Sequence, residues 1–272
     1  MNFRAFATHF SFHFRTGMRN KTLLMMNYLL PLGFYGLMGF IMAEINLLFL
    51  ETMIPAMVLF AILSATLLGV PDPLVTDREK GVFRSYKING IPALSILAIP
   101  TLTTMLHMTV VSLIIALTAP VLFDAPAIAN WPLFILVFLA TAISYAGLSV
   151  LIGVISSSSR ITVLWAQLIY LPSILLSGMM ISYSLMPEVI QPFTRLFPAT
   201  YAMYAFRDLG MNLPGDFNSV WSLLIMFAGG ILSFIMAVYL FNWDSRNSSR
   251  RGHPVMAVIA LLPYIFGIFF FL

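Results

Sequence analysis

The sequence contains no cysteine and carries very little charge. The absence of cysteine excludes a disulfide scaffold and any metal site built on thiolates. Only 9% of the 272 residues are charged and 60% are hydrophobic, whereas a typical soluble domain is about 25% charged. A soluble fold of this composition would expose apolar surface to water, but a lipid bilayer accepts such side chains directly. The composition therefore indicates a membrane protein.

Motifs for nucleotide binding and hydrolysis are also missing. The lysines are Lys21, Lys80 and Lys87, and none follows a glycine, so no Gly-x-x-x-x-Gly-Lys-Ser/Thr loop can hold a phosphate. The sequence has no His-Glu-x-x-His and no Gly-x-Ser-x-Gly motif. His9 and His13 are four residues apart without a third ligand nearby. We therefore expect no metal and no cofactor bound by this chain.

Six apolar stretches have the length, roughly 17–25 residues, that crosses about 30 Å of hydrocarbon as a helix. The predicted fold class is all-α, a polytopic membrane bundle with a six-helix domain over residues 22–243. The stretches are residues 22–43, 48–70, 94–122, 132–155, 161–181 and 219–241. A basic loop and an extra apolar helix are predicted for 244–272. The apolar part of residues 244–272 is the stretch 255–272, which is short and contains Pro263. This stretch therefore either crosses the membrane or re-enters it.

The basic residues are distributed asymmetrically. Every lysine and arginine except Arg195 and Arg207 lies in the N-terminal arm, in a loop between even- and odd-numbered stretches, or after the sixth stretch. These residues are Arg4, Arg15, Arg19, Lys21, Arg78, Lys80, Arg84, Lys87, Arg160, Arg246, Arg250 and Arg251. The opposite side holds Glu44, Glu51, Asp124, Glu188, Asp208 and Asp216. Since cytoplasmic loops carry the excess of Lys and Arg, the pattern predicts a cytoplasmic N-terminus. It also accounts for the net charge of +4 without nucleic acid.

Residues 1–21 are predicted to form an amphipathic interfacial helix. At about 100° per residue, one face carries Phe3, Phe6, Phe10, Phe14 and Met18, and the other carries Arg4, Thr8, Arg15 and Arg19. Such a helix lies flat at the headgroups with its phenylalanines in the lipid. A disordered basic tail is the alternative.

Two connections are too long to be simple turns. One is cytoplasmic and covers residues 71–92. The other is extracellular, covers 182–218 and contains several prolines. Within it, 185–197 and 200–209 are predicted to be short helices that dip into the outer leaflet.

Carboxylates are absent from the centres of the apolar stretches. Ion-coupled transporters and pumps usually need intramembrane ionisable groups, so the chain has no evident energy source of its own. His107 is the one ionisable residue deep in a stretch, and Gln167 is a second polar candidate. Both are candidate functional groups, but both are also explained by hydrogen bonds to a neighbouring helix.

Two segments carry a resemblance to a known family. The first reads Asp77-Arg78-Glu79-Lys80-Gly81-Val82-Phe83-Arg84 and continues Ile88-Asn89-Gly90-Ile91-Pro92. The second reads Ser177-Gly178-Met179-Met180, then Met186-Pro187-Glu188, Gln191-Pro192, Phe197-Pro198-Ala199-Thr200-Tyr201-Ala202 and Arg207-Asp208. Up to about Trp243 the chain resembles type-2 ABC exporter permeases of drugs, polysaccharides or lipids. The tail beyond Asp244 departs from the family pattern, which usually ends in the cytoplasm after the sixth helix.

The resemblance implies that residues 71–92 dock on a separate cytoplasmic ATPase subunit, which binds the ATP and Mg. The implied ATPase-coupling residues are Asp77, Arg78, Glu79, Gly81, Phe83 and Arg84. Charged side chains of both signs would make ionic contacts, Phe83 would be an apolar anchor, and Gly81 would permit a turn. By the residues alone, a solvated loop that only enforces topology explains the segment equally well.

The resemblance also implies a second permease copy or a related chain, alternating access, and residence in the plasma (inner) membrane of a prokaryote. The second and fifth helices would line the path with Met53, Met57, Phe60, Trp165, Leu168 and Tyr170. These apolar side chains suit a hydrophobic or amphipathic cargo, such as a drug, a peptide antibiotic or a lipid-like molecule. The same side chains are also what helix packing or lipid contact would require.

Three other classes of protein stay open from the sequence. A non-transporting or sensory membrane subunit of an ABC complex would have the same sequence features. A secondary transporter conflicts with the missing intramembrane charges. An intramembrane enzyme would need a nucleophile–base pair or clustered acidic ligands within a helix, and the sequence contains neither.

Overall fold

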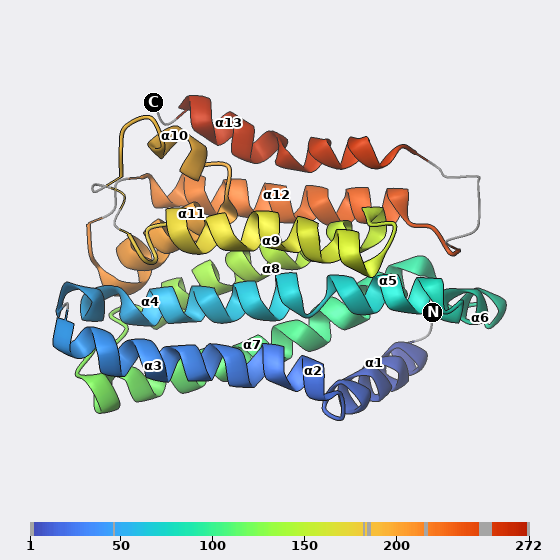
Figure 1. The fold of residues 1–272 in the computed structure, drawn as a ribbon, viewed down its shortest axis with the longest axis horizontal. Helices are drawn as coiled ribbons and strands as arrows, with labels where there is room; N and C mark the ends of the chain where they lie inside the picture. Colours follow the sequence, from blue (N-terminus) through green and yellow to red (C-terminus); the bar gives the residue numbers. More distant parts are fainter. Residues whose placement is uncertain are drawn as a thin grey trace.

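The fold is a bundle of long helices that lie side by side along its longest axis (Figure 1). The computed structural model describes residues 3–45, 47–181, 183, 186–214, 217–244 and 252–270, and within them the regular structure is entirely helical. The N-terminus and the short helix α6 (Val82–Ile88) lie at one end, which we call the α6 end. The C-terminus lies at the opposite end, beside α10 (Gln191–Thr194), which we call the α10 end.

Within the described residues, six helices are long and apolar enough to cross a membrane, as the sequence predicts. The first, Lys21–Met42, consists of α2 (Lys21–Leu24), the π-helical turn η1 (Met25–Leu29) and most of α3 (Leu30–Ile45). The second, Phe49–Glu79, runs through α4 (Leu47–Leu63), the π-helical turn η2 (Ser64–Leu68) and α5 (Pro71–Glu79). The others are α7 (Ala93–Phe123), α8 (Trp131–Ile155), α9 (Ser159–Leu176) and α12 (Ser219–Leu240).

The second helix is longer than the sequence predicted. The predicted stretch ended at residue 70, before Pro71, but the helix continues for nine more residues as α5. Pro71 occupies the start of α5, where its missing N–H costs no hydrogen bond and its fixed φ suits a helix. The predicted loop of residues 71–92 is therefore two helices, α5 and α6.

The connection between α9 and α12 also differs from its prediction. The fifth stretch was predicted to end at residue 181, but α9 ends at Leu176. Of the predicted helix at 185–197, the described residues 186–197 contain only the single helical turn α10, whereas α11 (Pro198–Ala205) and the π-helical turn η4 (Phe206–Gly210) occupy the second predicted helix. Every residue of α11 is buried, in contact with α8 and α12, so this segment packs on protein.

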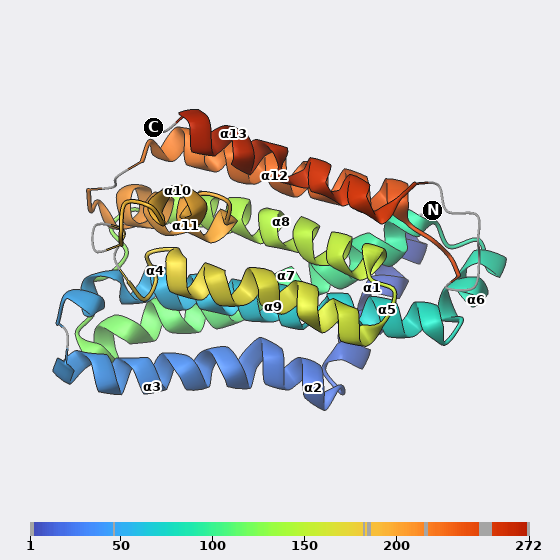
Figure 2. The same cartoon turned by 45° about the horizontal axis from the view of Figure 1, so that its top comes forward.

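The C-terminal segment runs back along α12 (Figure 1, Figure 2). It consists of the 3₁₀-helix η5 (Pro254–Leu261, 8 residues) and α13 (Leu262–Phe270, 9 residues). At about 2.0 Å per residue for the 3₁₀ part and about 1.5 Å for the α part, it spans about 30 Å. The stretched geometry thus lets a short segment cover the thickness of the hydrocarbon core.

Small residues allow this segment and α8 to approach α12 closely. A Cβ on Gly229 would lie 2.2 Å from the Tyr264 hydroxyl, and one on Gly147 would lie 2.2 Å from the carbonyl oxygen of Gly230. The Tyr264 side chain is fully buried and shares a hydrogen bond of 2.7 Å with the Ser144 hydroxyl. Close backbone contact and interhelical hydrogen bonds replace the hydrophobic driving force, which is absent between helices in lipid.

A single methyl group at Gly147 tests this contact. Gly147→Ala forces the backbones of α8 and α12 apart, so we expect it to destabilise the protein by about 1–3 kcal/mol. Gly33→Ala on α3 is the matched control, since a Cβ there meets nothing within 4 Å, and it should be neutral or stabilising by up to about 1 kcal/mol. Thermal unfolding in detergent measures both. Equal melting temperatures for the two variants would contradict the close approach.

Candidate functional site

The candidate site is the α5–α6 segment, residues 71–92, at one end of the bundle. Gly81 separates its two helices with a φ of 76°, a left-handed conformation that favours glycine. The Gly81 amide donates to the Arg78 carbonyl, and the Arg84 amide donates to the Gly81 carbonyl. Gly90, with a φ of 71°, ends the second helix before Pro92 and α7. The predicted turn at Gly81 is therefore present.

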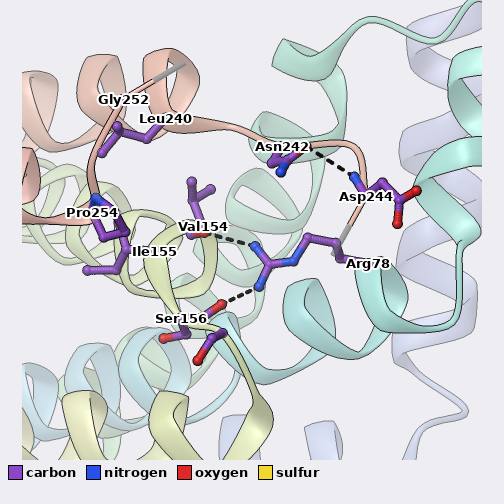
Figure 3. A pocket seen from close by; sticks show the side chains of 10 residues that line it. Arg78, Val154, Ile155, Ser156, Leu240, Asn242, Asp244, Gly252 and Pro254 are labelled. Carbon is purple, nitrogen blue, oxygen red and sulfur yellow. Dashed lines mark hydrogen bonds between the residues drawn. The ribbon is translucent and has the colours of Figure 1, made fainter. Parts of the chain in front are cut away.

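Arg78 is buried, with 7% of its surface exposed. Its guanidinium donates to the carbonyl oxygens of Val154 at 2.8 Å and of Ser156, both at the C-terminal end of α8 (Figure 3). A cation at this position is favoured by the helix dipole and by the unpaired carbonyls of the last turn. The side chain is thus occupied inside the chain, and the ATPase-coupling role that the resemblance implies for Arg78 stays a prediction.

Phe83 is likewise internal. Its ring is 3% exposed and lies 5.5 Å from the ring of Phe241 at the end of α12. It belongs to an apolar cluster that also contains Val70, Leu74 and Met236. A buried aromatic ring stabilises a fold more than a ring that is partly exposed to water. The buried Phe83 ring therefore attaches α6 to the bundle. Its role as the apolar anchor for a partner, which the resemblance implies, stays a prediction.

Two charged contacts hold α6 against the segment after α12. The Arg84 guanidinium lies 2.6 Å from the Asp244 carboxylate, and this hydrogen bond raises the pKa of Arg84. The Lys87 ammonium lies 6.0 Å from the centre of the Trp243 ring, within the range of a cation–π contact. An exposed ion pair of this kind stabilises little by itself, but together with Phe83 it fixes where α6 lies.

The segment also presents an exposed surface, the α6 surface, defined by Glu79, Lys80, Arg84, Lys87 and Ile88. All five are exposed, and Ile88 is 85% exposed. Asp77 is only partly exposed and faces a cavity between α5, α7 and the N-terminal helix. An exposed isoleucine in the same short segment as exposed charges of both signs is typical of a protein-binding surface.

The six predicted path residues do not share one lining. Met53 and Met57 on α4 are fully buried, and Phe60 stacks on Phe34 with ring centres 4.2 Å apart. Tyr170 on α9 is buried beside Phe60, with its hydroxyl 3.4 Å from that of Ser64. The other two, Trp165 and Leu168, are 45% and 59% exposed on the outward side of α9. The structure thus brings together only the residues at the contact between α4 and α9.

His107 and Gln167 differ in their surroundings. The His107 ring is buried, stacks on Phe14 at 4.9 Å, and has its Nδ1 atom 2.6 Å from the Tyr28 hydroxyl. Its polar group is therefore bonded to a neighbouring helical segment. Gln167 is partly exposed on α9.

The N-terminal helix α1 (Phe3–Gly17) packs on α7. The side chains of Phe6, Phe10 and Phe14 are only partly exposed, and the His13 Nδ1 atom lies 3.0 Å from the Thr103 hydroxyl. The phenylalanine face was predicted to dip into lipid, but it shares its side of the helix with His13, which bonds to the bundle. The Phe3 and Arg4 side chains, and Arg246, Arg250, Arg251 and Asp216, lie outside what the structure describes.

Docking of α1 should weaken in acid. Burial, followed by the nearby His9 and His107, lowers the pKa of His13 from 6.5 to about 4. An undocked His13 returns to its ordinary pKa and binds a proton more readily, so docking is lost progressively as pH falls from about 6.5 to about 4, by up to about 3 kcal/mol. A spin label at Ser11→Cys, which is exposed in a cysteine-free chain, should become more mobile at pH 4.5 than at pH 7.

The control for this experiment is His13→Asn, which keeps a polar group near Thr103 but does not titrate. It should remove most of the pH response, with the remainder assigned to His9, whose pKa burial also lowers. Identical label mobility at both pH values in the unmodified background would rule out the titration of His13.

Among the described residues, no group of three or more His, Cys, Asp or Glu side chains could hold a metal ion. The six long apolar helices in the described part of the chain define a multi-pass α-helical membrane protein. Residues 43–239, the greater part of the chain, match the ABC-2 family transporter proteins, and the chain belongs to this family. It is the membrane component of an ABC-2 type transporter, and its 272 residues contain no ATPase domain. Membership implies partnership with an ABC ATPase.

Comparison with curated proteins and with solved structures finds no match.

Sequence reasoning missed the contribution of Trp243 and Asp244 to the site. These residues are far from α6 in the sequence, and their contacts with Lys87 and Arg84 depend on where α12 ends. It also missed Ile88 as the exposed apolar residue. The available signal was its position among polar residues in the Ser85-Tyr86-Lys87-Ile88-Asn89 stretch, which matches no core pattern.

Proposed function

We propose that this chain is the permease of an ATP-driven exporter that moves a hydrophobic or amphipathic substrate outward across the membrane. A separate ATPase subunit, carrying the ATP and Mg, docks on the α6 surface. A second permease copy or a related chain completes the path, and the two alternate between inward- and outward-open states. The observation that carries this proposal is the α6 surface itself, a segment at the end of the bundle in which charged residues of both signs and Ile88 are exposed.

The charge distribution supports a cytoplasmic position for this surface. The described basic residues Arg15, Arg19, Lys80 and Lys87 belong to elements at the α6 end, whereas Arg195 and Arg207 belong to elements near α10 and α11. Because Lys and Arg accumulate on the cytoplasmic side, the α6 end faces the cytoplasm. The membrane is then the plasma membrane of a prokaryote, as in the exporters that the chain resembles.

The outward side of α9 supports the kind of cargo and the need for a second subunit. Trp165 and Leu168 are exposed there, and Val163, Leu164, Leu171 and Leu175 are each more than half exposed. A path lined by such residues would accept an apolar or amphipathic molecule. Met53 and Met57, which one chain encloses completely, would join the path only in another conformation.

Charge reversal at Glu79 tests the docking. The complex is purified gently from its native membrane, and the partner is identified as a subunit with a phosphate-binding loop. Glu79→Lys places a like charge beside Lys80, Arg84 and Lys87, and we expect the affinity for that subunit to fall about tenfold, or about 1.4 kcal/mol. Binding is measured with purified components at fixed salt, because such contacts are screened.

Glu188→Lys is the matched control, since it makes the same charge change at an exposed residue in the segment near α10. It should leave ATPase binding unchanged. If no such ATPase co-purifies, or if both variants bind it equally well, the docking role of the α6 surface is refuted.

The same orientation predicts an extracellular C-terminus. With the α6 end in the cytoplasm, the η5–α13 segment crosses the membrane beside α12. Cysteines placed singly at His253 and Phe269, both exposed, report on its two ends. In intact cells a membrane-impermeant maleimide should label Phe269→Cys and should label His253→Cys only after permeabilisation. Labelling of both from the same side would mean that the segment re-enters.

A further inference from the structure

Arg78 belongs to the α5–α6 segment but contributes nothing to the α6 surface, because its side chain is buried. Its guanidinium reaches from α5 to three carbonyl groups, those of Gly153 at 3.5 Å, Val154 at 2.8 Å and Ser156. Gly153 and Val154 belong to the last turn of α8, and Ser156 begins the turn that leads to α9. Figure 3 shows the guanidinium between Val154 and Ser156. Burying a charge costs free energy unless the charged group is hydrogen-bonded. The hydrogen bonds to these carbonyl groups therefore allow Arg78 to be buried here.

Two further contacts join α5 to the same place. Gly153 lies so close to α5 that a Cβ on it would be 3.1 Å from the Leu74 side chain and 3.1 Å from the Pro71 carbonyl oxygen. The Thr76 hydroxyl lies 3.5 Å from that of Ser159, the first residue of α9. The side chains of α5 therefore contact the end of α8, the α8–α9 turn and the start of α9 together.

The chain itself joins α5 to a different helix. α4 and η2 are continuous, and only Gly69 and Val70 separate η2 from α5 in the helical span Phe49–Glu79. A displacement of α5 passes to α4 through the backbone, but it reaches α9 only through side-chain contacts. Arg78 supplies the charged and multiply hydrogen-bonded member of those contacts.

We propose that Arg78 is a positioning residue that makes the α8–α9 turn move together with the α5–α6 segment. This inference rests on the proposed function, in which an ATPase subunit displaces that segment. Through Arg78 one displacement acts on α9, while through the backbone it acts on α4. These helices meet at Phe60 and Tyr170, so the link transmits the movement to both sides of that contact.

Arginine is suited to this task for a geometric reason. Its planar guanidinium presents five donors in a rigid fork, so it binds carbonyl groups on both sides of a helix end at once. A lysine ammonium keeps the charge as a compact point on a flexible stem. It can neutralise the end of α8 without holding the helix and the following turn in one arrangement.

A paired-label distance measurement tests the link. Cysteines at Ser85 and Ser157, both exposed in a chain without native cysteine and both outside the five residues that define the α6 surface, carry spin labels on α6 and on the α8–α9 turn. The complex contains the ATPase subunit that co-purifies with the unmodified chain, with and without ATP and vanadate. With Arg78 intact, we expect a narrow distance distribution that nucleotide does not change. With Arg78→Gln, nucleotide should shift the mean distance or increase the width of the distribution about twofold, because the segment then moves without the turn.

Arg160→Gln is the matched control, since it removes the same charge from an exposed arginine in the first turn of α9, outside the α6 surface. It should leave the distance between Ser85 and Ser157 unchanged by nucleotide. Arg78→Lys serves if Arg78→Gln does not assemble, and we expect it to show the same nucleotide-dependent broadening.

Three outcomes would overturn the inference. The first is a nucleotide-dependent distance change with Arg78 intact. The second is an Arg78→Gln distribution equal to that with Arg78 intact. The third is broadening that is the same with and without nucleotide, which would make Arg78 a static helix cap.

Binding of the ATPase subunit separates this failure from failure of the proposed function. Arg78→Gln should bind the subunit within about threefold of the unmodified chain, because the buried side chain is not part of the docking surface. Failure of the unmodified chain to bind any ATPase would refute the proposed function and this inference with it.

Discussion

The backbone contact between α8 and α12 at Gly147 and Gly230 is the interaction on which the other elements depend. With no side chain at these positions, the two helices approach until a Cβ on one would meet the carbonyl oxygen of the other. α8 is then enclosed, and its buried side chains extend from Phe134 to Val154. The adjacent glycine on α12, Gly229, leaves space for Tyr264 of the C-terminal segment. The close pair thus sets the positions of three helices, and it leaves the last turn of α8 where Arg78 can reach it.

Hydroxyl groups provide the second kind of contact inside the bundle. Tyr145 shares a hydrogen bond with Ser173 at 3.1 Å and accepts one from the Ala199 amide at 2.9 Å, so it joins α8, α9 and α11. Tyr35 bonds Thr118 at 2.8 Å, between α3 and α7. Each pair satisfies polar groups that lipid could not. These tyrosine hydroxyls therefore join helices, and the buried Tyr28–His107 pair follows the same rule.

The α5–α6 segment combines two roles that its sequence motif does not separate. Arg78 and Phe83 face inward and attach the segment to α8 and α12, whereas Glu79, Lys80, Lys87 and Ile88 face outward. The turn at Gly81 divides the two helices. A surface that must transmit force needs a firm attachment behind it, and the inward residues supply that attachment. The segment after α12 adds to it through Asp244 and Trp243.

The sequence by itself determined the all-helical membrane fold and the starts and ends of most spans, because a stretch of apolar residues long enough for the bilayer has no other stable arrangement. It also located the α5–α6 segment, through the motif around Gly81. Only the tertiary structure decided which residues of that motif face inward. Arg78 and Glu79 are adjacent and both charged, but only Arg78 has unpaired helix-end carbonyls within reach. The contacts of Arg84 with Asp244 and of Tyr264 with Ser144 join residues more than 100 positions apart, and local periodicity carries no information about such pairs. They arise from how closely the helices pack, which depends on glycines whose partners a single sequence does not reveal.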